Sequence, residues 1–119
     1  MQNHVGIFRI EEDLQRGLHE LDLLVRRAAR LKVEGSRLFN PGWHLARDLK
    51  SMLTVSLAVA LSAQARKESR GAHSRIDFPN YDEWWARNHN IVVREGEQMT
   101  LKQLPVEEMP AELKEIVEG

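Results

Sequence analysis

Charged side chains gather in one short stretch of the sequence, residues 66–77. Six of them can form ion pairs or forked hydrogen bonds: Arg66, Glu68, Arg70, His73, Arg75 and Asp77. Guanidinium groups bind carboxylates or backbone carbonyls through paired hydrogen bonds that fix the geometry of a contact. We therefore predict that these residues form a buried docking motif that clamps the chain to a neighbouring domain. The alternative is a surface charge cluster, whose exposed pairs would contribute little to stability.

Reaction chemistry is not indicated by the remaining polar residues. Ser69 and His73 have helical spacing, but nothing marks a nucleophile turn or a supporting acid. The five histidines include no i, i+4 pair with a third ligand nearby, and the chain has no cysteine. No Gly-x-Gly-x-x-Gly phosphate loop occurs. We therefore assign no catalytic, cofactor-binding or metal-ligating residue.

Residues 65–79 read Ala-Arg-Lys-Glu-Ser-Arg-Gly-Ala-His-Ser-Arg-Ile-Asp-Phe-Pro. This run closely resembles a motif of the succinate dehydrogenase and fumarate reductase flavoprotein subunits, in their C-terminal helical domain. Residues 1–14 resemble the opening of that domain, and residues 36–40 resemble its inter-helix loop. Three matches in the family's order and spacing are a specific signal, and they place roughly residues 1–93 in register.

The resemblance implies that residues 1–119 are a single C-terminal helical domain of an FAD-dependent enzyme that interconverts succinate and fumarate. In such an enzyme FAD and the substrate are bound by upstream domains, and electrons pass to an iron–sulfur subunit and then to quinone. The docking motif would contact the FAD-binding domain of the same parent chain. Partner and membrane-anchor subunits would hold a cytoplasmic protein at the inner face of the cell membrane. This domain alone is expected to bind no FAD and to be inactive.

Two other interpretations stay open on the sequence alone. L-aspartate oxidase carries a similar Glu-Ser-Arg-Gly motif, here residues 68–71. A free-standing helical interaction module fits the neutral charge and the missing catalytic constellation equally well. The matches at residues 1–9 and 36–40 favour the succinate and fumarate enzymes.

Two long helices are expected to carry the docking motif. Residues 11–32 have an apolar seam with helical spacing, acidic residues in the first turn and basic residues in the last. Residues 40–67 begin with Asn40-Pro41-Gly42, a typical helix start, and are apolar on most of their circumference. We therefore expect the second helix to be covered on most sides. A short connection predicts that the two helices are antiparallel.

The predicted fold class is all-α, a small spectrin-repeat-like antiparallel bundle with a short C-terminal β-hairpin or irregular tail. Residues 1–8 have apolar spacing that fits a helix, and we expect the end of a longer, truncated helix there. The bundle and the docking motif would occupy residues 1–79. Apolar surface left over on the second helix predicts contact with the missing parent or self-association.

Residues 80–119 are expected to form a short helix, a hairpin and a tail. Asp82 and Glu83 favour a helix at 81–88, with one of its two tryptophans buried and the other at the rim. The runs 91–94 and 99–104 flank a glycine turn and predict a hairpin. A last short helix at 111–118 has a disordered tail as its alternative.

Composition limits the classes of partner. Lysine and arginine number 17 against 18 aspartates and glutamates, which argues against a dedicated nucleic-acid-binding protein. The longest apolar run, residues 58–61, is far shorter than the roughly 20 residues of a membrane span. Membrane association would therefore depend on partner subunits.

Overall fold

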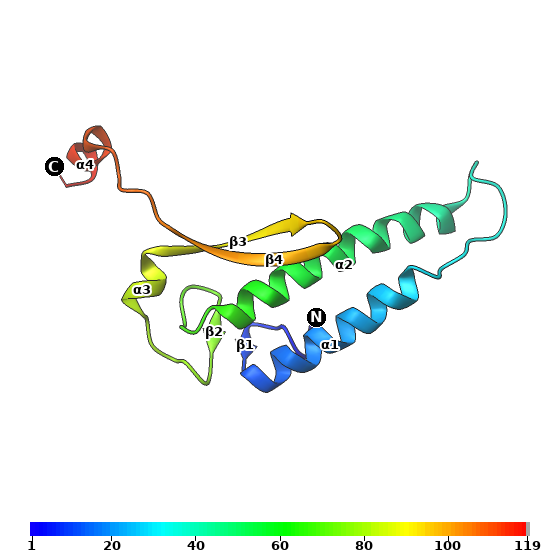
Figure 1. Cartoon of the computed structure of the whole chain (residues 1–119), viewed down its shortest axis with the longest axis horizontal. Helices are drawn as coiled ribbons and strands as arrows, with labels where there is room; N and C mark the ends of the chain where they lie inside the picture. The colour runs from blue at the N-terminus through cyan, green and yellow to red at the C-terminus, as the bar shows by residue number, and fades with distance from the viewer. Residues whose placement is uncertain (119) are drawn as a thin grey trace.

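The computed structural model describes residues 1–118, and Gly119 lies outside the described residues. The elements in chain order are β1 (Phe8–Arg9), α1 (Glu11–Ala28), α2 (Pro41–Ala65), β2 (Ser74–Arg75), α3 (Glu83–Ala86), β3 (Asn88–Glu95), β4 (Gln98–Pro105) and α4 (Ala111–Glu118). The long helices α1 and α2 run side by side in opposite directions, and the β3–β4 hairpin lies along α2 (Figure 1). The molecule is elongated, with extents of 63 × 36 × 26 Å.

The two long helices confirm the sequence prediction in place and direction. The side-chain oxygen of Asn40 accepts a hydrogen bond from the backbone N–H of Gly42, which caps α2 as expected. Helix α1 ends at Ala28, four residues before the predicted end at residue 32. The apolar core lies between the two helices and consists of Val5, Leu14, Leu21, Leu53, Ala60 and Ala63.

The N-terminal residues do not form a helix, so the prediction of a third, truncated helix is wrong. Val5 turns back on Met1 through an N–H···O bond of 2.7 Å, and β1 then pairs in parallel with β2. Gly17 of α1 makes room for this segment, because a Cβ there would lie 3.0 Å from the Cβ of His4. The segment crosses one face of α1 and places Val5 in the core.

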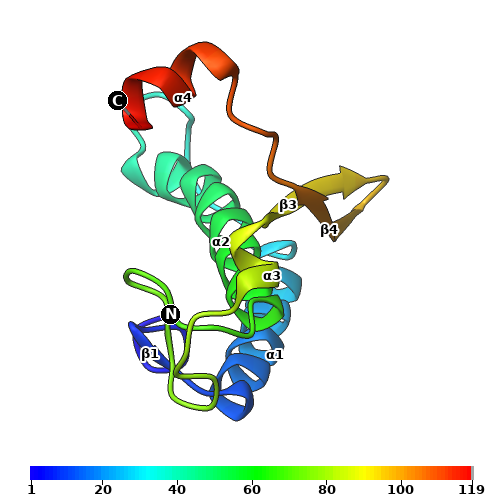
Figure 2. The same ribbon diagram turned by 90° about the vertical axis from the view of Figure 1, so that its left-hand side faces the viewer.

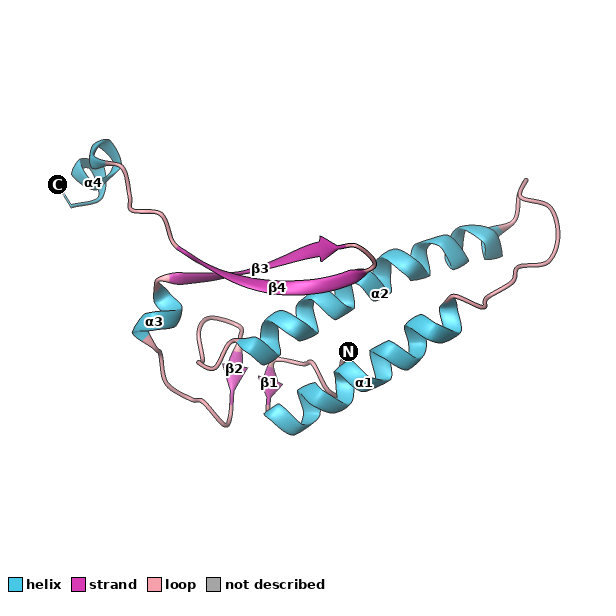
Figure 3. Cartoon of the chain, in the orientation of Figure 1, coloured by secondary structure: helices cyan, strands magenta, loops and turns pink. Residues whose placement is uncertain are grey.

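The fold is mixed α/β, and the all-α prediction is wrong. Figure 3 shows two separate two-stranded sheets, a parallel pair β1–β2 and an antiparallel pair β3–β4. The predicted hairpin is confirmed, but its strands have eight residues each, in register from Asn88↔Pro105 to Glu95↔Gln98. Gly96 supplies the positive φ of 64° in the turn. The extra strand residues and the extended N-terminus account for the difference in class.

Helix α2 is less covered than its composition predicted. Leu53, Ala60 and Ala63 are buried, but Leu45, Met52 and Val55 are exposed. The expectation that α2 is covered on most sides is therefore wrong for this chain by itself. The apolar surface that we expected to remain uncovered is present on this helix.

The C-terminal third confirms its predicted elements with small differences. Helix α3 is shorter than expected, and the carboxylate of Asp82 caps it by accepting from the N–H of Trp85. Trp85 is buried and Trp84 is half exposed, as predicted. Helix α4 is present and stands apart from the two long helices in Figure 1, while in Figure 2, seen from the side of α4, it overlaps the loop between α1 and α2. Within residues 1–118, no helix has the length and apolar character that crossing a bilayer requires.

Candidate functional site: a charge cluster that joins the helix ends

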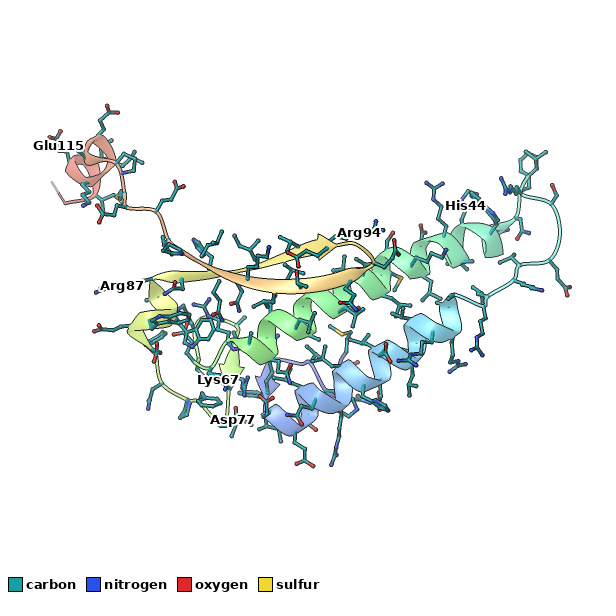
Figure 4. The ribbon with its side chains drawn as sticks, viewed as in Figure 1. His44, Lys67, Asp77, Arg87, Arg94 and Glu115 are labelled. Carbon is teal, nitrogen blue, oxygen red and sulfur yellow. The ribbon has the colours of Figure 1, made fainter. Side chains whose placement is uncertain are left out.

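The structure places all six predicted docking residues at one end of the long helices. They make hydrogen bonds with one another and with two residues near the N-terminus, Arg9 and Glu11. We call these eight residues the charge cluster. Two of them, Arg75 and Glu68, have fully buried side chains, and each is the centre of one half of the cluster. Figure 4 shows Asp77 beside the beginning of α1.

Arg75 uses its whole guanidinium group. Its Nη1 donates to the carbonyls of Ala63 and Gln64, 3.2 and 3.1 Å away, which belong to the last turn of α2. Its Nε and Nη2 donate to the two carboxylate oxygens of Asp77, each at 2.7 Å, and Nη2 also donates to Glu11 at 3.0 Å. A cation at the C-terminal end of a helix is stabilised by the helix dipole and satisfies free carbonyls. Arg75 therefore ends α2 and ties it to α1.

Asp77 caps α1 from a distant part of the sequence. The residue before the helix, Ile10, has no side-chain hydrogen bond that could cap it. Instead, the backbone N–H of Glu11 donates to the Oδ2 of Asp77 at 3.0 Å. A carboxylate at a helix N-terminus is favoured both by the dipole and by the free N–H groups. The Arg75–Asp77 pair thus stabilises opposite ends of two helices at once.

Glu68 is the second buried centre, and it organises the residues that follow α2. Its carboxylate accepts from the Nε of Arg66 at 2.8 Å and from the Nε and Nη2 of Arg70 at 3.0 and 3.1 Å. It also accepts from the backbone N–H of Asp82 at 3.0 Å, just before α3. The Nη2 of Arg66 donates onward to the carbonyl of Trp85 at 2.8 Å. Glu68 therefore fixes the position of α3 and of the buried tryptophan.

His73 links the N-terminal segment to the end of α2. Its Nδ1 lies 2.6 Å from the Nη1 of Arg9, and its Nε2 lies 3.0 Å from the carbonyl of Arg66. Because a guanidinium can only donate, Nδ1 must accept and Nε2 must carry the proton. Arg9 in turn donates from Nε to the carbonyl of Gly6 at 2.6 Å. The neutral imidazole is thus held in one tautomer between two arginines.

The charges of the cluster are fixed near neutral pH. The hydrogen bonds from Arg70 lower the pKa of Glu68 to about 2, and those from Arg75 lower the pKa of Asp77 to about 2. Burial lowers the pKa of His73, and the nearby positive charges of Arg9, Arg75 and Arg66 lower it further. The carboxylates are therefore ionised and the histidine is neutral. Such an arrangement positions segments and binds them together.

The surface around the cluster is apolar. Five exposed or half-buried side chains border it, and we call them the apolar rim: Ile7, Phe8, Ile76, Phe78 and Tyr81. The parallel β1–β2 pairing brings the first three together. Phe78 lies under the guanidinium of Arg75 and Tyr81 under that of Arg70, each with 5.0 Å from Cζ to ring centroid. Arg75 and Arg70 of the charge cluster thus hold two aromatic rings of the rim in place.

Sequence reasoning missed two members of the cluster. Glu11 was interpreted only as an acidic residue in a first helical turn, although it also accepts from Arg75 across 64 residues. Arg9 carried no signal at all, because its role depends on the β1–β2 pairing that the sequence did not predict. The predicted arginine forks are present, but their carboxylate and carbonyl partners lie within this chain. Contact with another domain stays a prediction.

Known proteins share both the sequence and the fold of this chain. The profile of the family described as fumarate reductase flavoprotein C-term matches residues 1–117. The succinate dehydrogenase flavoprotein subunit of Coxiella burnetii is 40% identical over 97 residues, which cover 81% of this chain and 16% of that protein. The fumarate reductase flavoprotein subunit of Mycobacterium tuberculosis is 37% identical over 98 residues, covering 82% and 17%.

A solved structure agrees with these matches. The Mycobacterium smegmatis Sdh1 complex in the apo form superposes with a TM-score of 0.82 at 41% identity, covering 92% of this chain and 19% of that chain. The chain spans about a sixth of the length of the curated relatives named above. The match over residues 1–117 and these relatives show that this chain belongs to the family of C-terminal domains of succinate dehydrogenase and fumarate reductase flavoprotein subunits.

Proposed function

We propose that residues 1–119 act as the single C-terminal domain of a flavoprotein oxidoreductase that interconverts succinate and fumarate. The domain docks on the FAD-binding domain of the same parent chain and contributes no group to the reaction. The observation that carries this proposal is the apolar rim, which the charge cluster holds in place and which no other described element covers. Exposed apolar surface of this kind is typical of an interface.

The contact is made by the rim rather than by the buried charges. Arg75 and Glu68 already have partners for their side-chain atoms within this chain, so neither is available to another domain. Arg70 is the exception, because its side chain is 41% exposed and lies over Tyr81 at the edge of the rim. In this arrangement the charge cluster sets the shape of the docking surface, while the rim and Arg70 form the contact.

FAD is bound elsewhere in the parent. A dinucleotide requires a glycine-rich turn from a strand into a helix, with the phosphates at the helix N-terminus. Within the described residues, β1 is followed directly by Ile10 and α1, and β4 leads to α4 through residues 106–110, which contain no glycine. These residues do not fit FAD. We therefore place FAD, succinate binding and hydride transfer in the upstream domains.

The family also suggests the setting of the parent. Electrons from FAD would pass to an iron–sulfur subunit and then to quinone through membrane-anchor subunits. The parent would thus lie on the cytoplasmic face of the cell membrane, held there by these subunits. The names of the relatives, which are succinate dehydrogenase and fumarate reductase flavoprotein subunits, support this assignment.

The docking proposal can be tested with a matched pair of phenylalanines. Phe8 belongs to the rim, whereas Phe39 is fully exposed in the loop between α1 and α2, at the other end of the molecule. In the full-length parent, Phe8→Ser should lower flavin content and succinate oxidation, and Phe39→Ser should leave both unchanged. The thermal melt of the isolated domain should be unaffected by either substitution. Unchanged flavin content and activity in Phe8→Ser, and in a second rim variant, Ile76→Ser, would overturn the proposal.

A further inference from the structure

Helix α4 is an acidic amphipathic helix without a partner in the described chain. Leu113, Ile116 and Val117 have i, i+3, i+4 spacing, so they share one face, and each is at least half exposed. Glu112 lies at one edge of this face and Lys114 at the other, Glu115 lies on the opposite side of the helix, and the linker before the helix adds two more glutamates. The only hydrogen bonds between α4 and the rest of the described chain reach the neighbouring Pro110. Figure 4 shows Glu115 at the far end of the linker.

A basic apolar groove lies on the outer side of α1. Its lining consists of Glu20, Leu23, Leu24, Arg26, Arg27 and Arg30. The two leucines are almost half exposed, although they occupy the middle of the helix. Arg26 forms an ion pair with Asp22 at 2.9 Å, whereas Arg27 and Arg30 have no carboxylate partner among residues 1–118. The groove thus combines two exposed leucines with two unpaired guanidinium groups.

Helix α4 and the groove on α1 are complementary in apolar surface and in charge. The apolar face of α4 fits the leucines, while Glu112 at its edge and the net negative charge of the helix and its linker match the sign of the unpaired arginines. Complementary charge steers association and fixes register, while the apolar face supplies most of the driving force. We propose that α4 of one copy of this chain docks in the α1 groove of a second copy.

The geometry of one chain excludes the same contact within that chain. Figure 1 shows α4 at one end of the long axis and the C-terminal half of α1 toward the other. The linker of five residues, 106–110, begins where β4 ends, on the side of α4. Fully extended, five residues span at most about 17 Å. That is about a quarter of the 63 Å long axis, so α4 reaches the groove of another molecule and not its own.

Such a contact is heterologous, because the two surfaces that meet are different. Each copy contributes one helix and one groove, so every contact leaves a free helix at one end and a free groove at the other. The assembly therefore closes into a ring or grows as an open chain. The exposed ionic part of the contact is screened by salt, so the association weakens as ionic strength rises.

Sedimentation equilibrium of the 119-residue chain tests this contact. The wild-type mass should increase with protein concentration at low salt and decrease at high salt. Two single variants should each remain monomeric: Ile116→Asp, which destroys the apolar face of α4, and Arg27→Glu, which reverses a charge in the groove. Arg94→Glu in the hairpin is the matched control and should associate like wild type.

Mixing the two monomeric variants provides the decisive measurement. Ile116→Asp still has an intact groove, and Arg27→Glu still has an intact helix. An equimolar mixture should therefore form a heterodimer with one working contact and stop there. In a single chain, Arg27→Glu combined with Glu112→Arg should regain part of the association. A wild-type monomer at all concentrations, association unaffected by Ile116→Asp, or a mixture that stays monomeric would each overturn the proposal. None of these outcomes bears on docking through the apolar rim.

Discussion

Arg75 and Asp77 form a two-point ion pair, with both hydrogen bonds 2.7 Å long, in which each residue also completes a different helix. The guanidinium of Arg75 donates hydrogen bonds to two carbonyls at the end of α2, and the carboxylate of Asp77 accepts one from the first N–H of α1. A single pair of side chains thus serves the C-terminus of one helix and the N-terminus of its neighbour.

Loss of Arg75 should destabilise the domain itself. Arg75→Ala would remove a fully buried guanidinium and leave two carbonyls at the end of α2 without their partner, whereas the partly exposed Asp77 would keep the N–H of Glu11. Leaving buried polar groups unsatisfied costs about 1–3 kcal/mol. Urea denaturation of the isolated domain measures the change. The exposed Arg94→Ala serves as control, with a shift within about 0.5 kcal/mol. Equal shifts for the two variants would show that the pair does not support the fold.

The domain should lose stability in acid because two of its carboxylates are bound to arginines. Glu68 and Asp77 have a pKa of about 2 in the folded chain, against ordinary values of 4.5 and 3.8. The unfolded chain therefore binds protons first as the pH falls, so stability decreases between about pH 4.5 and pH 2. Above about pH 4.5 both carboxylates are ionised in the folded and in the unfolded chain, so their full contribution to stability is present. The denaturant midpoint of each protein is measured from neutral pH down to about pH 2 and compared with its own value at neutral pH. The decrease should be smaller in Asp77→Asn than in wild type.

His73 adds a second, milder dependence at higher pH. Burial and three arginines hold its pKa below 6.5 in the folded chain, so folding favours the neutral ring. Stability should be complete above pH 6.5 and should decrease as the pH falls from there toward the lowered pKa. His73→Gln carries no titrating ring, so its slope in this window should be smaller. The pKa of the ring can be read directly from its proton resonances in an NMR titration, and a value above 6.5 would contradict this account.

The two faces of α2 should respond differently to truncation. Leu53 is 7% exposed in the core, whereas Val55 is 63% exposed on the same helix. Leu53→Ala should destabilise the domain by about 2–5 kcal/mol, because it removes buried methyl groups and leaves a cavity. Val55→Ala should change the free energy of unfolding by less than about 0.5 kcal/mol. Equal effects would show that Val55 is covered in solution.

The sequence predicted those elements whose signals are local. The seam of α1, the cap at Asn40 and the glycine turn of the hairpin each depend on residues close together in the chain, and all three are confirmed. The six charged residues at 66–77 were also predicted to form a buried network, because arginines, carboxylates and a histidine at such density are unusual. Their number and type indicated an ordered network, and the structure contains one.

Long-range pairing was not predictable in the same way. The spacing of Val5 and Phe8 fits a helix, but the segment gains more by crossing Gly17 and pairing with β2, which no local pattern reveals. The partners of Arg9 and Glu11 depend on that pairing. The prediction that α2 is covered on most sides was wrong for a different reason. Apolar composition predicts that a surface is to be buried, but it does not say whether this chain or another one buries it.

The cap that Asp77 provides for α1 has a consequence for the order of events during synthesis. The helix and its cap are separated by 66 residues, so α1 leaves the ribosome without the group that completes its first turn. At roughly 5–20 residues per second, the delay is about 3–13 s. The cap and the β1–β2 pairing both require this long loop to close. Closing it is slow compared with forming a helix. The N-terminal helix is therefore expected to stay frayed at its beginning until most of the domain has been translated.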